Sequence, residues 1–214
     1  MYDVILFDVD GTLLDTSRGI LMSLEQTLER YGIDYGFLTE EDRRTFIGPP
    51  MELSLERWFG LKGEMNAEVC SSYRKIYRED NLMYADPYEG IEKALSDLKD
   101  AGVALGVASY KKQDYLLKIL EGFGLDRYFS AICGSDYSGK LTKSDIINNC
   151  IESMDVKDKS RVLMLGDTVY DSDGARNAGV DFALACWGFG DVPEEDLVMR
   201  ATDPEDLAEK IINC

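Results

Sequence analysis

The 214-residue chain contains no histidine. This absence excludes Ser-His-Asp and Cys-His catalysis and every metal site that needs an imidazole ligand. Its five cysteines (Cys70, Cys133, Cys150, Cys186 and Cys214) are odd in number, and none belongs to a CxxC pair. Zinc ribbons and thioredoxin-like redox chemistry therefore have no support. The chemistry open to the chain uses carboxylates, lysine, hydroxyl groups and metals that prefer oxygen ligands.

Basic residues are scarce, with 23 Lys and Arg against 41 Asp and Glu and a formal net charge of −18. Sequence-independent binding of nucleic acid needs a basic surface, and so does adhesion to an anionic membrane. We therefore expect neither partner and interpret the charge as an acidic, soluble surface. Hydrophobic residues make up 45% of the chain, which is enough for a folded core of ordinary size.

Long apolar runs are also missing. The chain enters an apolar stretch, Val4–Phe7, almost at once, without the basic and extended apolar regions of a signal peptide. No stretch reaches the apolar length that a membrane-spanning helix requires. Together with unpaired thiols, these features predict a cytoplasmic protein.

Short apolar runs alternate with amphipathic segments along most of the chain. The runs with the pattern of buried strands are Val4–Phe7, Val103–Ala108, Phe129–Cys133, Val162–Leu165 and Val180–Ala185. The segments with helical spacing are Gly90–Asp100, Asp114–Phe123, Lys143–Met154 and Asp171–Ala178. This alternation predicts an α/β fold, with a Rossmann-like, mostly parallel sheet covered by helices on both faces.

One segment interrupts the alternation. From Ser17 to Met83 the apolar spacing is helical and no convincing strand occurs. A connection of this length inside a compact domain is expected to have structure of its own. We therefore predict an inserted all-helical domain over residues 16–84 and an α/β core formed by residues 1–15 and 85–214. Gly48-Pro49-Pro50 predicts a sharp break between two helices of the insertion.

Paired carboxylates follow the first predicted strand. Asp8 and Asp10 are separated by one residue, and Gly11 gives the backbone freedom to turn out of the sheet there. Two carboxylates this close repel each other unless a cation lies between them, so the pair suggests a magnesium site. By itself a DxD pair is equally compatible with an ordinary turn.

A second acidic pair follows the predicted strand Val162–Leu165. Asp167 lies at its carboxyl end, and Asp171, four residues later, can face the same pocket. The alternative for Asp171 is an acid at a helix N-terminus, stabilised by the helix dipole. Asp173 fits that alternative better, and we exclude it from the site.

Two further segments have groups that can bind a phosphoryl oxygen. Ser109-Tyr110-Lys111 follows the second predicted strand, where a hydroxyl and a backbone N–H are available, although an ordinary serine turn would look the same. Lys143 opens a predicted helix, where a cation is unfavourable unless it binds an anion. A solvated surface lysine is the alternative, and it describes Lys140 better.

These weak signals gain weight from their common position. Asp8, Ser109 and Asp167 each follow a different predicted parallel strand, and in open α/β sheets the ligand crevice lies beyond the carboxyl ends of the strands. Four acids, one hydroxyl and one lysine would meet there. Phosphoryl transfer needs this combination of a nucleophile, a metal and positive charge on the transferred oxygens.

The order and spacing of these motifs resemble the haloacid dehalogenase superfamily, specifically phosphatases with a helical cap after the first strand. Asp8-Val9-Asp10-Gly11-Thr12 looks like the first motif of the family, Ser109 the second, Lys143 the third, and Gly166-Asp167 through Asp171 the fourth. The resemblance covers essentially the whole chain. It implies a phosphoric monoester hydrolase that depends on magnesium.

The resemblance also implies roles for the catalytic residues. Asp8 would attack phosphorus and form an aspartyl-phosphate, and Asp10 would protonate the leaving alcohol and then activate the hydrolytic water. Ser109 and Lys143 would hold the phosphoryl oxygens. Dehalogenases with the same core attack carbon and lack the second aspartate, so Asp10 indicates phosphorus as the target.

For the metal, the resemblance implies Mg²⁺ held by Asp8, by the backbone carbonyl of Asp10 and by Asp167. Asp171 would support the waters of the metal or Lys143.

The substrate is expected to be a small phosphorylated metabolite. The segment Thr45–Pro50, with Gly48, resembles the cap loop of phosphoglycolate-phosphatase-like and 5′-nucleotidase-like members, and it would close over the crevice. Tyr110 stands where relatives often have a small polar residue, and we include it among the substrate contacts. The alternative is a phosphosugar mutase of the β-phosphoglucomutase type, disfavoured because such relatives use a cap histidine. The sequence does not indicate an oligomeric state.

Overall fold

The computed structural model of the chain describes residues 2–212. It has two compact units, of which the first contains Met1–Asp15 and Pro87–Cys214 and the second is Thr16–Asp86. We expected the second unit to end at residue 84, and in the structure it ends two residues later, at Asp86. Short strands β2 (Leu14–Asp15) and β3 (Asp86–Pro87) occur where the chain passes between the units.

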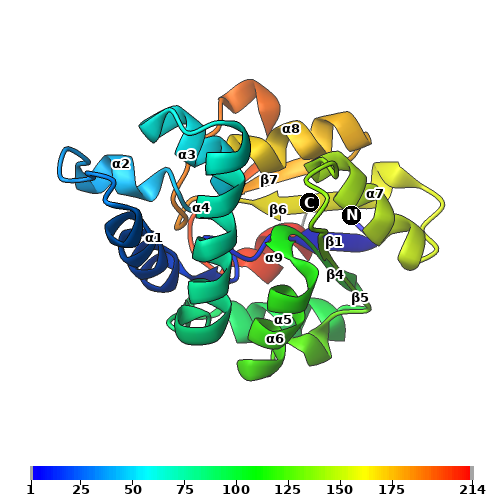
Figure 1. Cartoon of the computed structure of the whole chain (residues 1–214). Coiled ribbons are helices and arrows are strands. Elements are labelled where there is room, and N and C mark those ends of the chain that lie inside the picture. Colours follow the sequence, from blue (N-terminus) through cyan, green and yellow to red (C-terminus); the bar gives the residue numbers. More distant parts are fainter. Residues whose placement is uncertain (1, 213–214) are drawn as a thin grey trace. The chain divides into compact units, whose positions relative to one another are not determined.

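A six-stranded parallel sheet forms the centre of the first unit (Figure 1). Its strands are β1 (Val4–Phe7), β4 (Ala104–Lys112), β5 (Ala131–Ser135), β6 (Val162–Gly166), β7 (Asp181–Ala185) and β8 (Met199–Ala201). They lie in the order β5-β4-β1-β6-β7-β8. The four apolar residues of β1 pair with β4 on one side and with β6 on the other, and all four are buried. The predicted α/β class and parallel sheet are confirmed.

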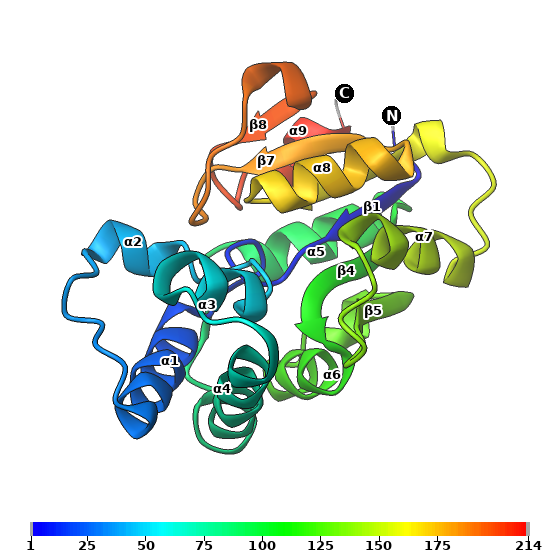
Figure 2. The ribbon, with the colours of Figure 1, turned by 45° about the horizontal axis from the view of Figure 1, so that its top comes forward.

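Helices cover both faces of this sheet (Figure 2). They are α5 (Ile91–Asp100), α6 (Gln113–Gly122), α7 (Lys143–Ser153), α8 (Val169–Ala178) and α9 (Leu207–Ile212). Helices α7 and α8 pack on one face, where their apolar residues join those of β1 and β6 in a buried core, and α5 and α6 lie on the other. The chain adds strands first on one side of β1 and then on the other, and crossovers of one hand then place the helices on opposite faces.

Three features of the sheet differ from the prediction. Strand β5 begins and ends two residues later than the expected Phe129–Cys133. Strand β4 continues to Lys112, beyond the expected end at Ala108, and its register with β5 shifts between Ala108 and Lys112. The polar residues of this stretch conceal the strand, although its backbone still pairs with Ser135. Strand β8 follows the expected last strand and was not predicted, because three residues are too few for a recognisable pattern.

The second unit is helical, as predicted. It contains α1 (Ser17–Tyr31), α2 (Glu40–Arg44), α3 (Met51–Phe59) and α4 (Gly63–Ile76), which continues into a π-helical turn, Tyr77–Asn81. Helices α1 and α4 pack together, and the Asn81 side chain donates a 3.0 Å hydrogen bond to the Ser23 hydroxyl on α1. The Gly48–Pro50 break lies between α2 and α3, which confirms that prediction.

Within residues 2–212, no helix has both the length and the apolar character needed to cross a membrane. Cys70, Cys133, Cys150 and Cys186 are not in disulfide bonds among the described residues, and Cys214 lies outside those residues.

Candidate active site

Asp8 is held at the carboxyl end of the central strand. It directly follows β1, its backbone N–H donates to the carbonyl oxygen of Leu165 on β6 at 2.9 Å, and the residue is buried. The chain then turns tightly, because the Val9 carbonyl oxygen accepts hydrogen bonds from the N–H groups of Thr12, Leu13 and Leu14. This turn fixes the backbone that presents Asp8 and Asp10.

Two glycines make room for Asp167. Gly11 has a φ of +82°, and a Cβ atom there would lie 2.1 Å from Asp167 Oδ2. A Cβ atom on Gly188 would lie 2.3 Å from Asp167 Cβ. The Phe189 backbone N–H donates to Asp167 Oδ2 at 2.8 Å, so the segment after β7 also positions this acid.

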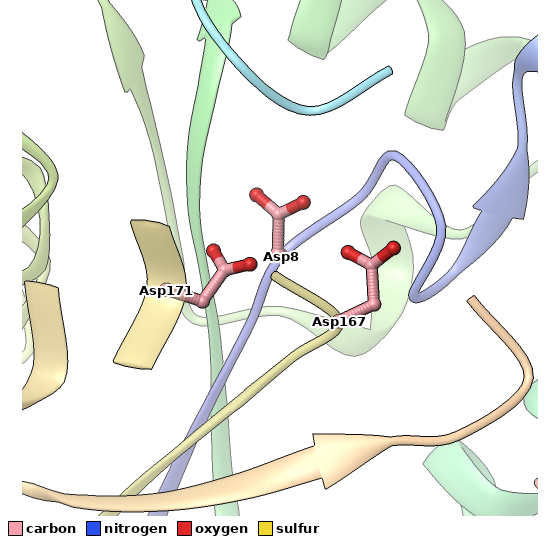
Figure 3. A group of neighbouring side chains, drawn as sticks. All are labelled: Asp8, Asp167 and Asp171. Atoms are coloured by element: carbon pink, nitrogen blue, oxygen red, sulfur yellow. The ribbon is translucent and has the colours of Figure 1, made fainter. Parts of the chain in front are cut away.

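Three buried carboxylates converge at this edge of the sheet (Figure 3). Asp8, Asp167 and Asp171 each offer one oxygen, and these oxygens lie within 4.8 Å of one another. Burial, and then the neighbouring Asp171 and Asp10 carboxylates, raise the pKa of Asp8 to about 7 despite the opposing effect of Lys143. Burial together with the Asp171 and Asp8 charges also raises the pKa of Asp167 well above its ordinary value. A bound cation would therefore stabilise the ionised carboxylates of this cluster.

Lys143 lies between two of these acids. Its Nζ atom is 2.6 Å from Asp8 Oδ1 and 2.6 Å from Asp171 Oδ1, and its side chain is only 3% exposed. Burial by itself would lower the pKa of Lys143, but the Asp171 and Asp8 carboxylates outweigh burial and raise it. These two anions account for a cation in the first turn of α7, where the helix dipole alone would disfavour it.

Asp171 satisfies both interpretations of its position. Its Oδ2 atom accepts hydrogen bonds from the Thr168 backbone N–H at 3.0 Å and from the Thr168 hydroxyl at 2.7 Å, which caps α8. Its Oδ1 atom binds Lys143. Asp173, excluded from the site above, is exposed on α8 and pairs with Arg176.

Tyr110, near the end of β4, also contacts Lys143. The Tyr110 hydroxyl accepts a 2.8 Å hydrogen bond from the Lys143 backbone N–H, and Lys143 Nζ lies 5.7 Å from the centre of the Tyr110 ring. Ser109 is buried, and its hydroxyl accepts the backbone N–H of Lys111 at 3.3 Å. We expected Tyr110 to contact the substrate, and in the structure it contacts Lys143, the residue expected to bind the phosphoryl group.

One site residue has no role in the sequence interpretation. Lys111 Nζ lies 2.9 Å from Asp10 Oδ1, and the two side chains are 3% and 10% exposed. The predicted strand ends at Ala108, so strand alternation did not extend to Lys111, which the structure places on β4. With all groups ionised, four carboxylates and two ammonium groups give the side chains of the site a net charge of −2.

Gly48, which we expected in a substrate-binding loop, belongs to the second unit. It has a φ of +96° and lies in the turn between α2 and α3. Positive φ is readily accessible only to glycine, which explains the residue type there.

The donor set fits a hard divalent cation. Asp167 Oδ1 is buried and has no hydrogen-bond partner among the described residues. The neighbouring oxygens belong to carboxylates, which Mg²⁺ prefers as ligands. One divalent cation would also balance the net charge of −2.

The protein-family comparison agrees with this geometry. A family described as haloacid dehalogenase-like hydrolase matches residues 5–185, which run from the second residue of β1 through the helical unit to the end of β7. The chain belongs to this family.

Curated relatives align over nearly the whole chain. A phosphoglycolate phosphatase from Aquifex aeolicus is 31% identical over 98% of this chain and 97% of its own. A 5′-nucleotidase from Pseudomonas aeruginosa is 34% identical over 95% of this chain and 89% of its own. The tyrosine-protein kinase PtkA from Mycobacterium tuberculosis is 33% identical over 97% of this chain and 72% of its own. At similar identity, these relatives thus have different activities.

A solved structure has the same fold over its full length. The crystal structure of a predicted phosphatase from Clostridium acetobutylicum covers 100% of both chains with a TM-score of 0.90 and 32% identity. The similarity therefore extends through the helical insertion as well as the α/β core.

Proposed function

We propose that this haloacid dehalogenase-like hydrolase is a magnesium-dependent phosphatase that hydrolyses a small phosphomonoester. The observation that carries the proposal is the environment of Asp8. This carboxylate is buried, bound by Lys143 at 2.6 Å, and clustered with Asp167, whose Oδ1 atom has no hydrogen-bond partner among the described residues. A nucleophile, a cation and a metal-binding oxygen in one place are what phosphoryl transfer requires.

In the proposed reaction, an Asp8 oxygen attacks phosphorus and the bond from phosphorus to the leaving oxygen breaks. Asp10 donates its proton to that oxygen, which leaves as an alcohol, and an aspartyl-phosphate remains on Asp8. Asp10 then takes a proton from water, which attacks phosphorus and releases phosphate, so that Asp8 is regenerated. Ser109 and Lys143 hold the phosphoryl oxygens during both steps.

Mg²⁺ would be held by the Asp8 and Asp167 carboxylates and by the backbone carbonyl of Asp10. When bound, it offsets the repulsion between the carboxylates and the phosphoryl oxygens. Asp171 contributes through Lys143, because its two oxygens are already bound to Lys143 and Thr168.

We further propose that the helical unit acts as a cap that excludes water and selects the leaving group, with Gly48 in its substrate-facing loop. The names of the relatives support a phosphoglycolate-phosphatase-like or 5′-nucleotidase-like activity. A phosphosugar mutase is disfavoured, because the chain has no histidine to assist a sugar hydroxyl.

The test is phosphate release from a panel containing phosphoglycolate, nucleoside monophosphates, sugar phosphates and pyrophosphate. Each compound is assayed with Mg²⁺ and with chelator, for the wild type, Asp8→Asn and the surface control Asp173→Asn. We expect magnesium-dependent turnover by the wild type and the control, and none by Asp8→Asn. Turnover by Asp8→Asn at the wild-type rate would refute the role of Asp8. Interconversion of sugar phosphates without phosphate release would favour the mutase, and transfer from ATP to tyrosine would favour a kinase.

A further inference from the structure

The strongest unexplained feature of the site is the buried Lys111. Its side chain is 3% exposed, and lysine is almost never buried to this degree unless it is paired. An ammonium group loses its hydration on burial, a cost that an apolar residue of similar length, such as methionine, would avoid. The Asp10 carboxylate, 2.9 Å from Lys111 Nζ, offsets this cost.

The two acids of the DxD segment are therefore held by different cations. Asp8 binds Lys143 from the N-terminus of α7, whereas Asp10 binds Lys111 from the end of β4. The tight turn at Val9 fixes the backbone at Asp10 but leaves its side-chain rotamers open. The ion pair with Lys111 selects one of them.

The shape of β4 directs Lys111 to this place. The register between β4 and β5 shifts between Ala108 and Lys112, and such an irregularity re-aims the side chains of a strand. Gly134 on β5 lies so close that a Cβ atom there would be 2.7 Å from the Lys111 carbonyl oxygen. The backbone of Lys111 is therefore locked between the Ser109 hydroxyl and Gly134.

We propose that Lys111 is a positioning residue, which holds the Asp10 carboxyl group where it transfers a proton to the leaving oxygen. This inference rests on the proposed phosphatase function and extends it. Displacing a proton-transfer group by about 1 Å can lower a rate about a hundredfold. The contribution of Lys111 should therefore depend on whether the leaving group needs a proton.

The experiment compares kcat/KM for two substrates that differ in this need. p-Nitrophenyl phosphate releases a stable phenolate, whereas an alkyl phosphate, the best one of the panel, releases an alcohol that must be protonated. For Lys111→Met we expect kcat/KM to fall at least ~10-fold with the alkyl phosphate and less than ~3-fold with p-nitrophenyl phosphate. Lys112→Met, on the same strand, is the matched control and should leave both values unchanged.

A double variant separates positioning from a general loss of structure. In Asp10→Asn/Lys111→Met both charges are absent, so the fold keeps no unpaired buried charge even if Lys111→Met alone is unstable. We expect its kcat/KM for the alkyl phosphate to equal that of Asp10→Asn. Lys111→Arg should recover part of the activity that Lys111→Met loses.

Three results would overturn the inference. These are equal losses for both substrates, a further loss in the double variant below Asp10→Asn, or weaker inhibition of Lys111→Met by inorganic phosphate, which would make Lys111 a phosphate ligand. The proposed function fails separately, through absence of magnesium-dependent turnover by the wild type.

Discussion

The pKa of Asp8 predicts an unusual effect of a neutralising substitution on stability. In the unfolded chain this carboxyl group ionises with its ordinary pKa of 3.8, whereas in the folded protein it keeps its proton up to about pH 7. Between these values the folded state binds more protons than the unfolded state, so the free energy of unfolding falls as pH rises. Without a metal, the ionised nucleophile destabilises the fold. Asp8→Asn removes this titration.

The size of the effect follows from the same two values. The interval from 3.8 to about 7 is about three pH units, each worth about 1.36 kcal/mol, so the full cost approaches ~4 kcal/mol for this buried group. Of the range from about pH 5.5 to about pH 8, only the ~1.5 pH units below the folded-state pKa of about 7 change the free energy of unfolding, by ~2 kcal/mol in total. The stability advantage of Asp8→Asn over the wild type should therefore grow by ~2 kcal/mol over this range.

Urea denaturation in chelator, at about pH 5.5 and about pH 8, measures this difference. Asp173→Asn removes an exposed charge from α8 and should shift stability by less than ~0.5 kcal/mol at either pH. Saturating Mg²⁺ should stabilise the wild type more than Asp8→Asn, because the ion binds the folded wild-type cluster. A difference between Asp8→Asn and the wild type that stays constant with pH would refute the argument.

Other substitutions test the supports of the site. Lys143→Met removes the cation that binds the buried Asp8 and Asp171 carboxyl groups, so we expect a loss of ~3–5 kcal/mol in urea denaturation at about pH 8, where Asp8 is ionised in the wild type, and partial recovery when Asp8→Asn is added. Tyr110→Phe removes the hydroxyl that accepts the Lys143 backbone N–H, and should cost ~1 kcal/mol while the ring stays in place. An unchanged urea midpoint in Tyr110→Phe would show that water replaces the hydroxyl.

Much of the catalytic edge could be predicted from the sequence. Asp8 and Asp167 lie at the carboxyl ends of apolar runs, and the carboxyl ends of parallel strands share one edge of the sheet. The pairing of β1 with β6 then places the two acids on adjacent strands. Lys143 could be inferred because a cation in the first turn of a helix needs an anion nearby. In each case, local sequence alone carried the signal.

Lys111 could not be assigned in the same way. Its partner, Asp10, is a hundred residues away, and the register shift that aims it is a property of the β4–β5 pairing. The contact between Tyr110 and the Lys143 backbone has the same origin, since a hydroxyl has many acceptable partners and only the packing of α7 on β4 selects one. Strand β8 could not be predicted for a different reason, because three residues are too few to show the alternation of a strand.

The central place of β1 in the sheet has a consequence for biosynthesis. Val4 is synthesised before its partners Ala104 and Val162, which leave the ribosome much later. During elongation, at about 5–20 residues per second, Val4–Phe7 is an unpaired apolar segment for many seconds. The helical insertion, which is a compact unit within Thr16–Asp86, can fold in that interval. Nascent chains that stop before β6 should therefore expose a strand prone to aggregation and be preferred clients of chaperones that bind short apolar segments.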